Sequence, residues 1–369
     1  MCGALTRPIQ PVSSVPMQRT FTVAVAILVL LTSCSRGDST LTAIDELFAS
    51  FTGDSVPGAS VLVVQDGRVA LARSYGMADL ESGIPATPAT NYRLASLTKQ
   101  FTASAVLLLV RDGALALDTP LTGVLSEFPD YGSSIALRHL LTHTSGVPDY
   151  EPFVPDTQSW QVKDRDVLEI LMRTEGTDFP PGGAYSYSNS GYALLAMVVE
   201  RASGQSFATF LNDRIFKPLG MNGTVAFEDG ISTVANRAFG YTITDGSVER
   251  TDQSTTSAVL GDGGIYSSVE DLAKWDDALA RGLLLDSVEW SEATTPARLT
   301  DGSETEYGFG WFIDSYGGHR RQRHSGDTRG FNNIIMRFPD DQVTIVILTN
   351  RDQAELTAIA ERMADILLR

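Results

Sequence analysis

The feature that most constrains the fold is a long apolar stretch in the first third of the chain. Residues 98–111 are apolar on nearly every side of a helix, and Asp112 and Gly113 follow directly. A surface helix would carry a polar face, so this composition predicts a helix buried at the centre of a domain and ended by the Asp-Gly pair. With 369 residues, of which 43% are hydrophobic, the chain is long enough to bury such a helix.

A serine and a lysine, Ser96 and Lys99, stand at the start of this predicted helix. Residues three apart on a helix share a face, with Cβ atoms about 5–6 Å apart, so the hydroxyl and the ammonium can meet. A serine hydroxyl needs an adjacent base to act as a nucleophile near neutral pH. Ser96 is therefore the candidate nucleophile, although the same spacing also occurs in solvated surface pairs.

Strand patterns lie near both ends of the chain. An opening helix is expected over residues 40–51. Two β-rich runs within residues 58–75 are joined by Asp66-Gly67, which is typical of a hairpin. Three further strands are predicted over residues 307–313, 331–337 and 342–348, and a closing helix over residues 353–368.

The section between these strands is dominated by helical patterns. Helices are predicted over residues 135–141, 162–173, 190–202, 207–216 and 269–281, with loops at 148–160 and 179–190. We therefore expect an α+β fold: an antiparallel sheet built from both chain ends and flanked by helices, with an inserted helical lobe and a cleft between the lobes.

The charge balance excludes one class of partner. The chain has 45 acidic and 28 basic residues, and its formal net charge is −17 at pH 7. Proteins that bind nucleic acids present basic surfaces to the phosphates. Nucleic acid is therefore not an expected partner.

The first 33 residues have the pattern of an export signal. Arg19 precedes an apolar run over residues 21–31 that is short for a membrane span, and Cys34 follows. Residues 31–34 resemble a bacterial lipobox, in which the cysteine is acylated and becomes the new N-terminus. We expect a signal over residues 1–33, a tether over 34–40 and the main folded domain over 41–369. An ordinary secretory signal is the alternative, and translation starting at Met17 instead of Met1 is left open.

Two short motifs later in the chain complement Ser96 and Lys99. Tyr187-Ser188-Asn189 precedes a predicted helix, and His324-Ser325-Gly326 precedes a predicted strand. Together they resemble the three motifs of the serine β-lactamase and penicillin-binding-protein superfamily, in the branch of class C β-lactamases, D-amino-acid peptidases and esterases. Residues 137–146, 261–268 and 307–311 resemble further stretches of the same superfamily, in the same order.

The resemblance implies an acyl-enzyme mechanism on Ser96. The resemblance suggests Tyr187 as the base. An unperturbed phenol has a pKa near 10, which is too high for a base near neutral pH. A nearby ammonium such as that of Lys99 lowers the pKa of an anion by about 1–3 units, so Lys99 would make the phenol usable. The reverse assignment, with a neutral Lys99 as base and Tyr187 as acid, stays open.

The resemblance also implies a substrate-binding set. Asn189 would orient Lys99 and the substrate carbonyl, and the backbone N–H groups of Ser96 and Asp327 would bind the oxyanion beside Gly326. An aspartate at position 327 departs from the usual small residue. His324 takes the place of a lysine, which favours esters, D-amino-acid amides or short peptides over β-lactams. Arg329 is a candidate for a substrate carboxylate.

Two alternatives to a serine hydrolase are an inactive protein with the same fold and a zinc-dependent enzyme. The chain could keep the fold as an inactive lipoprotein that serves as a binding or wall-associated module. His139 and His143 are four residues apart, but position 140 is leucine, so the zinc-protease motif is incomplete. His143 is instead expected to bond to the loop backbone near Ser145. No metal or organic cofactor is implied. The expected partners are a small-molecule or peptide substrate and a membrane, which the protein binds through acylated Cys34. The oligomeric state is left open. The protein would face the periplasm or the cell exterior.

Overall fold

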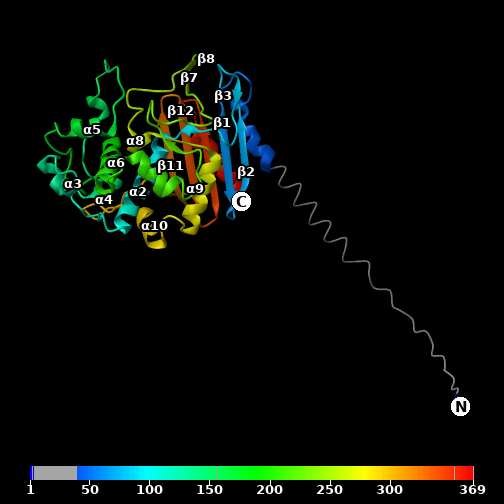
Figure 1. Ribbon diagram of the computed structural model, residues 1–369. Helices are drawn as coiled ribbons and strands as arrows, with labels where there is room; N and C mark the ends of the chain where they lie inside the picture. The colour runs from blue at the N-terminus through cyan, green and yellow to red at the C-terminus, as the bar shows by residue number, and fades with distance from the viewer. Residues whose placement is uncertain (2, 4–39, 156, 353, 369) are drawn as a thin grey trace. The chain divides into compact units, whose positions relative to one another are not determined.

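The computed structural model describes residues 1, 3, 40–155, 157–352 and 354–368 (Figure 1). Apart from Met1 and Gly3, the predicted signal lies outside the described residues, and so do Cys34 and the predicted tether up to residue 39. The chain divides into two compact units, Met1–Glu46 and Leu47–Arg369. Residues 40–47 form the opening helix that the sequence predicts. The second unit contains all the strands and the remaining helices.

A six-stranded antiparallel sheet is assembled from both ends of this unit. The hairpin predicted at Asp66-Gly67 is present, and its first strand pairs directly with the last strand of the chain, with Ala59 opposite Thr349. In spatial order the strands are β10 (Phe312–Tyr316), β11 (His319–Thr328), β12 (Phe331–Phe338), β13 (Val343–Thr349), β1 (Ala59–Gln65) and β2 (Arg68–Tyr75).

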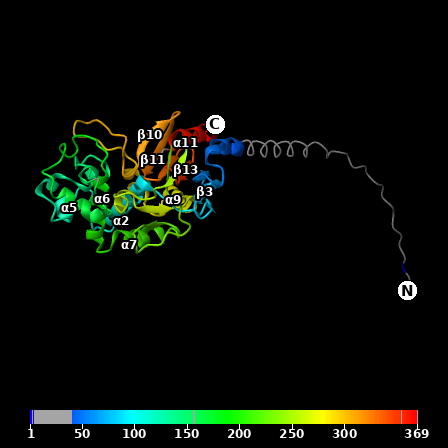
Figure 2. The ribbon, with the colours of Figure 1, turned by 90° about the horizontal axis from the view of Figure 1, so that it is seen from above.

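Both faces of this sheet are covered by helices. Arg337 hydrogen-bonds Asp276 of α9 (Val269–Arg281) through Nε at 2.7 Å. Met336, the preceding residue, lies against Arg321, which in turn pairs with Glu361 of α11 (Leu356–Leu367). Consecutive residues of a strand point to opposite faces, so α9 and α11 pack on opposite sides, as Figure 2 shows. This explains why every residue of β13 is buried.

The inserted lobe surrounds a buried central helix, α2 (Lys99–Arg111), in which eleven of thirteen residues are buried. It packs against α6 (Asn189–Ser203), another apolar helix that ends at Gly204 in a left-handed conformation. The other helices are α3 (Leu121–Val124), α4 (Leu137–Leu141), α5 (Asp164–Leu171), α7 (Phe207–Leu211), α8 (Leu260–Gly263) and α10 (Ser287–Ala293). These helices gather beside the sheet in Figure 1.

Three small sheets join the segments between the lobe and the large sheet. They consist of β3 (Met77–Asp79) with β4 (Ile84–Pro85), β7 (Tyr241–Thr244) with β8 (Ser247–Arg250), and β5 (Tyr92–Arg93) with β9 (Ile265–Ser267) and β6 (Val225–Ala226). Short 3-10 turns cover Ala49–Phe51, Ala95–Thr98, Asp130–Ser134 and Glu151–Phe153, and a π turn covers Asn212–Phe216. The expected α+β architecture, with its sheet from both chain ends, is confirmed.

Three predictions about individual elements are wrong. Residues 307–311 are not a strand, because Gly310 turns the chain with a φ of +77° and β10 begins only at Phe312. The longest strand, β11, was not predicted, because its sequence carries three arginines and two histidines. The helix predicted over residues 135–141 begins only at Leu137, because Ala136 is extended and caps it.

Arginine side chains of β11 are compatible with a sheet because they are paired. Arg321 and Arg323 both donate to the carboxylate of Asp314 on the neighbouring strand β10, at 2.7 and 2.9 Å. Arg320 pairs with Asp340 at 2.9 Å. Among the described residues, no helix combines the length and the apolar character needed to cross a bilayer.

Candidate active site

Lys99, the first residue of α2, is the centre of the candidate site. Its side chain is fully buried, and Nζ lies 3.0 Å from Ser96 Oγ, 2.8 Å from Asn189 Oδ1 and 2.9 Å from the backbone oxygen of Asp262. A buried amine or ammonium needs such partners, because an unpaired polar group in the interior is costly. The structure therefore brings Ser96, Lys99 and Asn189 together around one nitrogen atom.

Ser96 lies in the 3-10 turn Ala95–Thr98, and the α-helix begins at Lys99, one residue after the predicted start at residue 98. Ala95 has a φ of +50°, a left-handed conformation that is strained for alanine and common beside functional groups. Gly326 of β11 lies so close that a Cβ atom there would be 2.2 Å from the Leu94 oxygen. Only glycine at position 326 lets this strand approach the turn that carries Ser96.

A small polar cavity of about 50 Å³ opens beside Ser96. It is bounded by five segments distant in sequence, which contribute Arg93, Ala95, Ser96, Tyr150, Glu151, Asn189, Thr256, Asp262, Gly263, Asp327 and Thr328. The sheet supplies Asp327 and Thr328, and the helical lobe supplies most of the other residues. The cavity therefore lies between the two halves of the fold, where the sequence predicted a cleft.

Two acidic residues hold Asn189 at the start of α6. Its backbone N–H donates to Asp149 Oδ2 at 2.9 Å, and its Nδ2 atom donates to Glu151 Oε1 at 3.3 Å. With the amide nitrogen engaged by Glu151, the amide oxygen is left to accept from Lys99. The loop that contains Asp149 and Glu151 thus orients the asparagine that contacts Lys99.

The short helix α8 supplies the third partner of Lys99. Asp164 of α5, itself buried, accepts hydrogen bonds from the backbone N–H groups of Leu260 and Gly261 at 2.8 and 2.9 Å. A Cβ atom at Gly261 would lie 2.3 Å from the Tyr192 oxygen, so this turn packs directly on α6. Gly261 thus permits a close approach between the backbones of α8 and α6.

The side chain of Asp262 is a buried acid in the lining of the Ser96 cavity. Its Oδ2 atom accepts a hydrogen bond from the hydroxyl of Tyr150 at 3.1 Å. Burial raises the pKa of Asp262 to about 7, against the opposing effect of the Lys99 charge. The same burial raises the pKa of Tyr150, so its hydroxyl remains a hydrogen-bond donor.

Tyr187 contacts Lys99 through its ring, with Nζ 5.0 Å from the ring centroid. The ring is packed against His143, with centroids 4.1 Å apart. The buried His143 accepts from the Ser188 N–H through Nδ1 at 3.1 Å, and its backbone oxygen accepts from the Ser186 N–H at 2.9 Å. The expectation that His143 bonds near Ser145 is wrong: it holds the loop that carries Tyr187.

His324 lies deeper than a substrate-binding residue would. It is 1% exposed; Nε2 lies 2.9 Å from the Tyr307 hydroxyl and Nδ1 lies 2.6 Å from the Ser325 oxygen. Burial, together with the nearby Lys99 charge, lowers the pKa of His324 to about 3. The imidazole is therefore neutral near pH 7, and it is absent from the described residues that line the Ser96 cavity.

The structure separates Asp327 from Arg329. Asp327 lines the cavity, and its Oδ2 atom accepts from Asn332 Nδ2 at 3.1 Å, so the carboxylate is engaged with the neighbouring strand. Partial burial raises the pKa of Asp327. Arg329 is exposed in the turn after β11 and does not line the cavity described here.

Sequence reasoning missed the acidic wall of the cavity. Asp149 and Glu151 follow no motif, and Asp262 drew attention only through the glycines around it. Tyr150 lines the cavity and is also buried in the core. The imidazoles of His139 and His143 each accept from a backbone N–H, and the described residues contain no group of three or more potential metal ligands.

Comparisons with known proteins agree with this arrangement. The family model described as Beta-lactamase matches residues 44–368. The chain is 33% identical over 310 residues to Penicillin-binding protein 4* of Bacillus subtilis, covering 80% of this chain and 68% of that protein. It is 29% identical over 308 residues to D-aminopeptidase of Brucella canis, covering 80% of this chain and 56% of that protein. The chain thus spans little more than half of the latter relative.

A solved structure shows the same fold. The D-amino acid amidase from Ochrobactrum anthropi SV3, complexed with L-phenylalanine amide, superposes with a TM-score of 0.77. The alignment covers 89% of this chain and 99% of the amidase chain at 26% identity. Because the family model covers residues 44–368, most of the chain, this protein belongs to the beta-lactamase family of serine hydrolase-like proteins.

Proposed function

We propose that this chain is a serine hydrolase that forms an acyl-enzyme on Ser96 and acts on amides, peptides or esters whose acyl group carries a free amine. The observation that carries this proposal is the 3.0 Å contact between Lys99 Nζ and Ser96 Oγ at the wall of an open polar cavity. A nucleophile within hydrogen-bond reach of a titratable group is the arrangement that acyl transfer requires.

Lys99 is proposed as the group that takes the Ser96 proton. Two of its partners, the Asn189 amide oxygen and the Asp262 carbonyl, accept hydrogen bonds, so Lys99 can still donate to both once it has lost a proton, with its lone pair directed at the hydroxyl. Ser96 Oγ then attacks the substrate carbonyl. The backbone N–H groups of Ser96 and Asp327 are the proposed oxyanion donors, and Tyr187 is the proposed acid for the leaving group.

The acidic wall supports a substrate with a positive charge. Glu151, Asp262 and Asp327 line the cavity, whereas Arg93 is its one cationic side chain among the described residues. A free ammonium on the acyl group would be attracted to this wall. Two of the proteins compared above are a D-aminopeptidase and a D-amino acid amidase by name, so the preferred acyl groups are proposed to be D-amino acids.

Covalent labelling tests the acyl chemistry. The purified protein is treated with a fluorophosphonate or a penicillin, digested and examined by mass spectrometry. We expect an adduct on the peptide that contains Ser96, and none in Ser96→Ala. No adduct with either probe would favour the alternative, a binding or wall-associated module without turnover.

A substrate panel tests the acidic wall. D-amino-acid amides, their N-acetylated counterparts, p-nitrophenyl esters and the β-lactam nitrocefin are compared. We expect hydrolysis of the free-amine amides and of the esters, with weak or no nitrocefin turnover. Glu151→Gln should raise KM for the free-amine amides about tenfold and leave KM for a neutral p-nitrophenyl ester unchanged. An equal effect on both substrates would contradict recognition of the amine.

The two possible bases are distinguished by the leaving group. A p-nitrophenolate leaves without a proton, whereas an amine must be protonated as it leaves. If Lys99 is the base, Tyr187→Phe should keep acylation by p-nitrophenyl esters within about tenfold and lose amide hydrolysis by at least about 100-fold. Loss of both activities to the same extent would make Tyr187 the base.

We also propose export and membrane anchoring through Cys34. The support is the basic, apolar and lipobox-like order of residues 19–34. Acylation with two chains gives stable attachment to a membrane. The hydrolase would then act at the outer face of the membrane, in the periplasm or outside the cell.

A further inference from the structure

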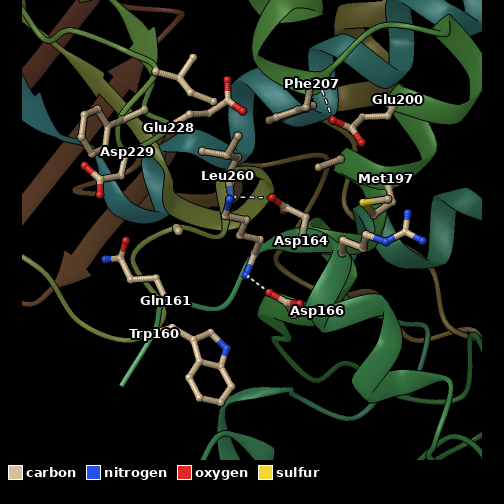
Figure 3. A pocket seen from close by; sticks show the side chains of 16 residues that line it. Trp160, Gln161, Asp164, Asp166, Met197, Glu200, Phe207, Glu228, Asp229 and Leu260 are labelled. Carbon is tan, nitrogen blue, oxygen red and sulfur yellow. Dashed lines mark hydrogen bonds between the residues drawn. The ribbon is translucent and has the colours of Figure 1, made fainter. Parts of the chain in front are cut away.

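A second and much larger cavity lies in the helical lobe. It encloses about 710 Å³ between the first turn of α5, the middle of α6, and two segments at residues 227–231 and 258–260 (Figure 3). This volume falls within the range of small-molecule sites, about 300–1,000 Å³. Of the described residues, none lines both this cavity and the one beside Ser96.

The walls of this cavity combine a buried apolar surface with exposed apolar side chains. Met197, Phe207 and Leu260 contribute the buried surface (Figure 3). Trp160 and Ile231 also line it and are 66% and 76% exposed. Large apolar side chains left in water at a cavity with an apolar interior are typical of a surface that a ligand covers.

The charges of the lining are predominantly negative. Five carboxylates face two cationic side chains, Lys163 and Arg165. Arg165 lies 3.7 Å from Glu169, which does not line the cavity, so part of its charge is directed elsewhere. An excess of negative charge in a partly enclosed space attracts cations.

The five carboxylates fall into two groups. Asp164, Asp166 and Glu200 accept hydrogen bonds from backbone N–H groups of the fold. The carboxylates of Glu228 and Asp229 make no hydrogen bond or ion pair with the described residues, and Figure 3 shows both beside the cavity. These two are therefore available to a ligand.

We propose that this cavity is a second ligand site, for a small organic cation with an aromatic or aliphatic body. Glu228 and Asp229 lie at one side of the cavity and attract the cationic centre, whereas Trp160 lies at the opposite side in Figure 3 and offers its indole to the organic body. Met197, Phe207 and Leu260 receive the apolar body. The proposal does not depend on turnover at Ser96.

Calorimetry with a defined probe tests the site. Benzyltrimethylammonium chloride is titrated into the full chain, and benzyl alcohol serves as the neutral comparator. We expect saturable binding of the cation, quenching of the Trp160 fluorescence, and affinity for benzyl alcohol that is at least about tenfold weaker. Absence of saturable binding up to about 10 mM, or equal affinity for the alcohol, would overturn the proposal.

Matched variants identify the place of binding. Glu228→Gln/Asp229→Asn should weaken binding at least about tenfold, and Trp160→Ala should weaken it and abolish the quenching. The control Asp245→Asn/Glu249→Gln removes the same charge from the β7–β8 hairpin, outside the cavity, and should bind as the unchanged protein does. Glu151→Gln should also leave binding unchanged. Weakening by Glu151→Gln, with no effect of Glu228→Gln/Asp229→Asn, would place the probe beside Ser96 and overturn the second site.

Discussion

The backbone oxygen of Asp262 lies 2.9 Å from Nζ of Lys99, and the turn that carries it is held by Asp164 from the other side. The position of a backbone oxygen is fixed only if the turn that contains it is held in place. Asp164 accepts from two consecutive N–H groups of that turn, and Thr102 of α2 donates to the Gly261 oxygen at 2.7 Å. The position of the Lys99 amine thus depends on a buried carboxylate that does not contact it.

Replacement of that carboxylate should therefore affect turnover. In Asp164→Asn, one amide oxygen replaces two carboxylate oxygens, so one of the two buried N–H groups loses its acceptor. We expect kcat to fall about 10- to 100-fold with KM nearly unchanged, because the substitution displaces Lys99 but leaves the carboxylates that line the Ser96 cavity in place. Steady-state kinetics on a p-nitrophenyl ester measures the two constants.

Asp166→Asn is the matched control for this prediction. Asp166 lies on the same helix and also accepts from a backbone N–H, that of Lys163, but it does not contact α8. Its replacement should leave kcat within about twofold of the original value. Equal losses of kcat in both variants would show a general effect on α5 and contradict the positioning role of Asp164.

A second prediction concerns the imidazole beneath Tyr187. His143→Phe keeps a ring against Tyr187 but leaves the buried Ser188 N–H without an acceptor, at a cost of about 1–3 kcal/mol in the free energy of unfolding. The loop of Tyr187 and Asn189 should loosen, so kcat should fall as well. Thermal unfolding and ester kinetics measure the two effects.

Two further variants make this prediction specific. His143→Asn supplies a side-chain oxygen near the position of Nδ1 and should restore part of both the stability and the kcat. His139→Phe removes an imidazole that accepts from the Ala136 N–H and has no recorded ring contact with Tyr187, so it should change stability without a matching loss of kcat. Loss of kcat in His139→Phe equal to that in His143→Phe would contradict the assignment.

The third prediction concerns acid stability. The folded protein holds His324 neutral, with a pKa of about 3, whereas an unfolded histidine takes up a proton below a pKa of about 6.5. The unfolded state therefore binds more protons between these pH values. The stabilisation from His324 is complete above pH 6.5 and falls by about 1.4 kcal/mol for each pH unit below it.

His324→Gln should remove this slope. Chemical denaturation of the original protein and the variant between pH 7.5 and 4.5 gives the difference between their free energies of unfolding. Asp164 and Asp262, whose pKa values are raised to about 7 by burial, act in the opposite direction but are present in both proteins. A difference that does not change with pH would contradict a neutral buried His324.

The fourth prediction concerns the N-terminal region. If Cys34 is acylated, globomycin treatment of expressing bacteria should cause the uncleaved precursor to accumulate, and labelled palmitate should be incorporated into the protein. Cys34→Ser should prevent the incorporation. Unchanged processing in the presence of globomycin would contradict the lipoprotein assignment and favour an ordinary secretory signal.

The sequence by itself determined the elements whose residues carry a local pattern. The apolar run at residues 98–111 can form only a buried helix, and the Asp66-Gly67 turn between two β-rich runs specifies the hairpin, since these signals lie within a few residues of one another. The spacing of Ser96 and Lys99 placed the two side chains on one face, and the contact at 3.0 Å follows from it.

Only the tertiary structure decided what depends on residues distant along the chain. The polar strand β11 is stable because Asp314, Asp340 and Glu361 pair with its arginines, and no local pattern shows those partners. Distant residues also decide three features of the candidate site. They are the burial of His324, the hydrogen bonds from the α8 turn to Asp164, and the position of Glu151 in the cavity lining. Burial and pairing depend on which residues are neighbours in space, so the sequence identified the candidate residues and the fold determined their environment.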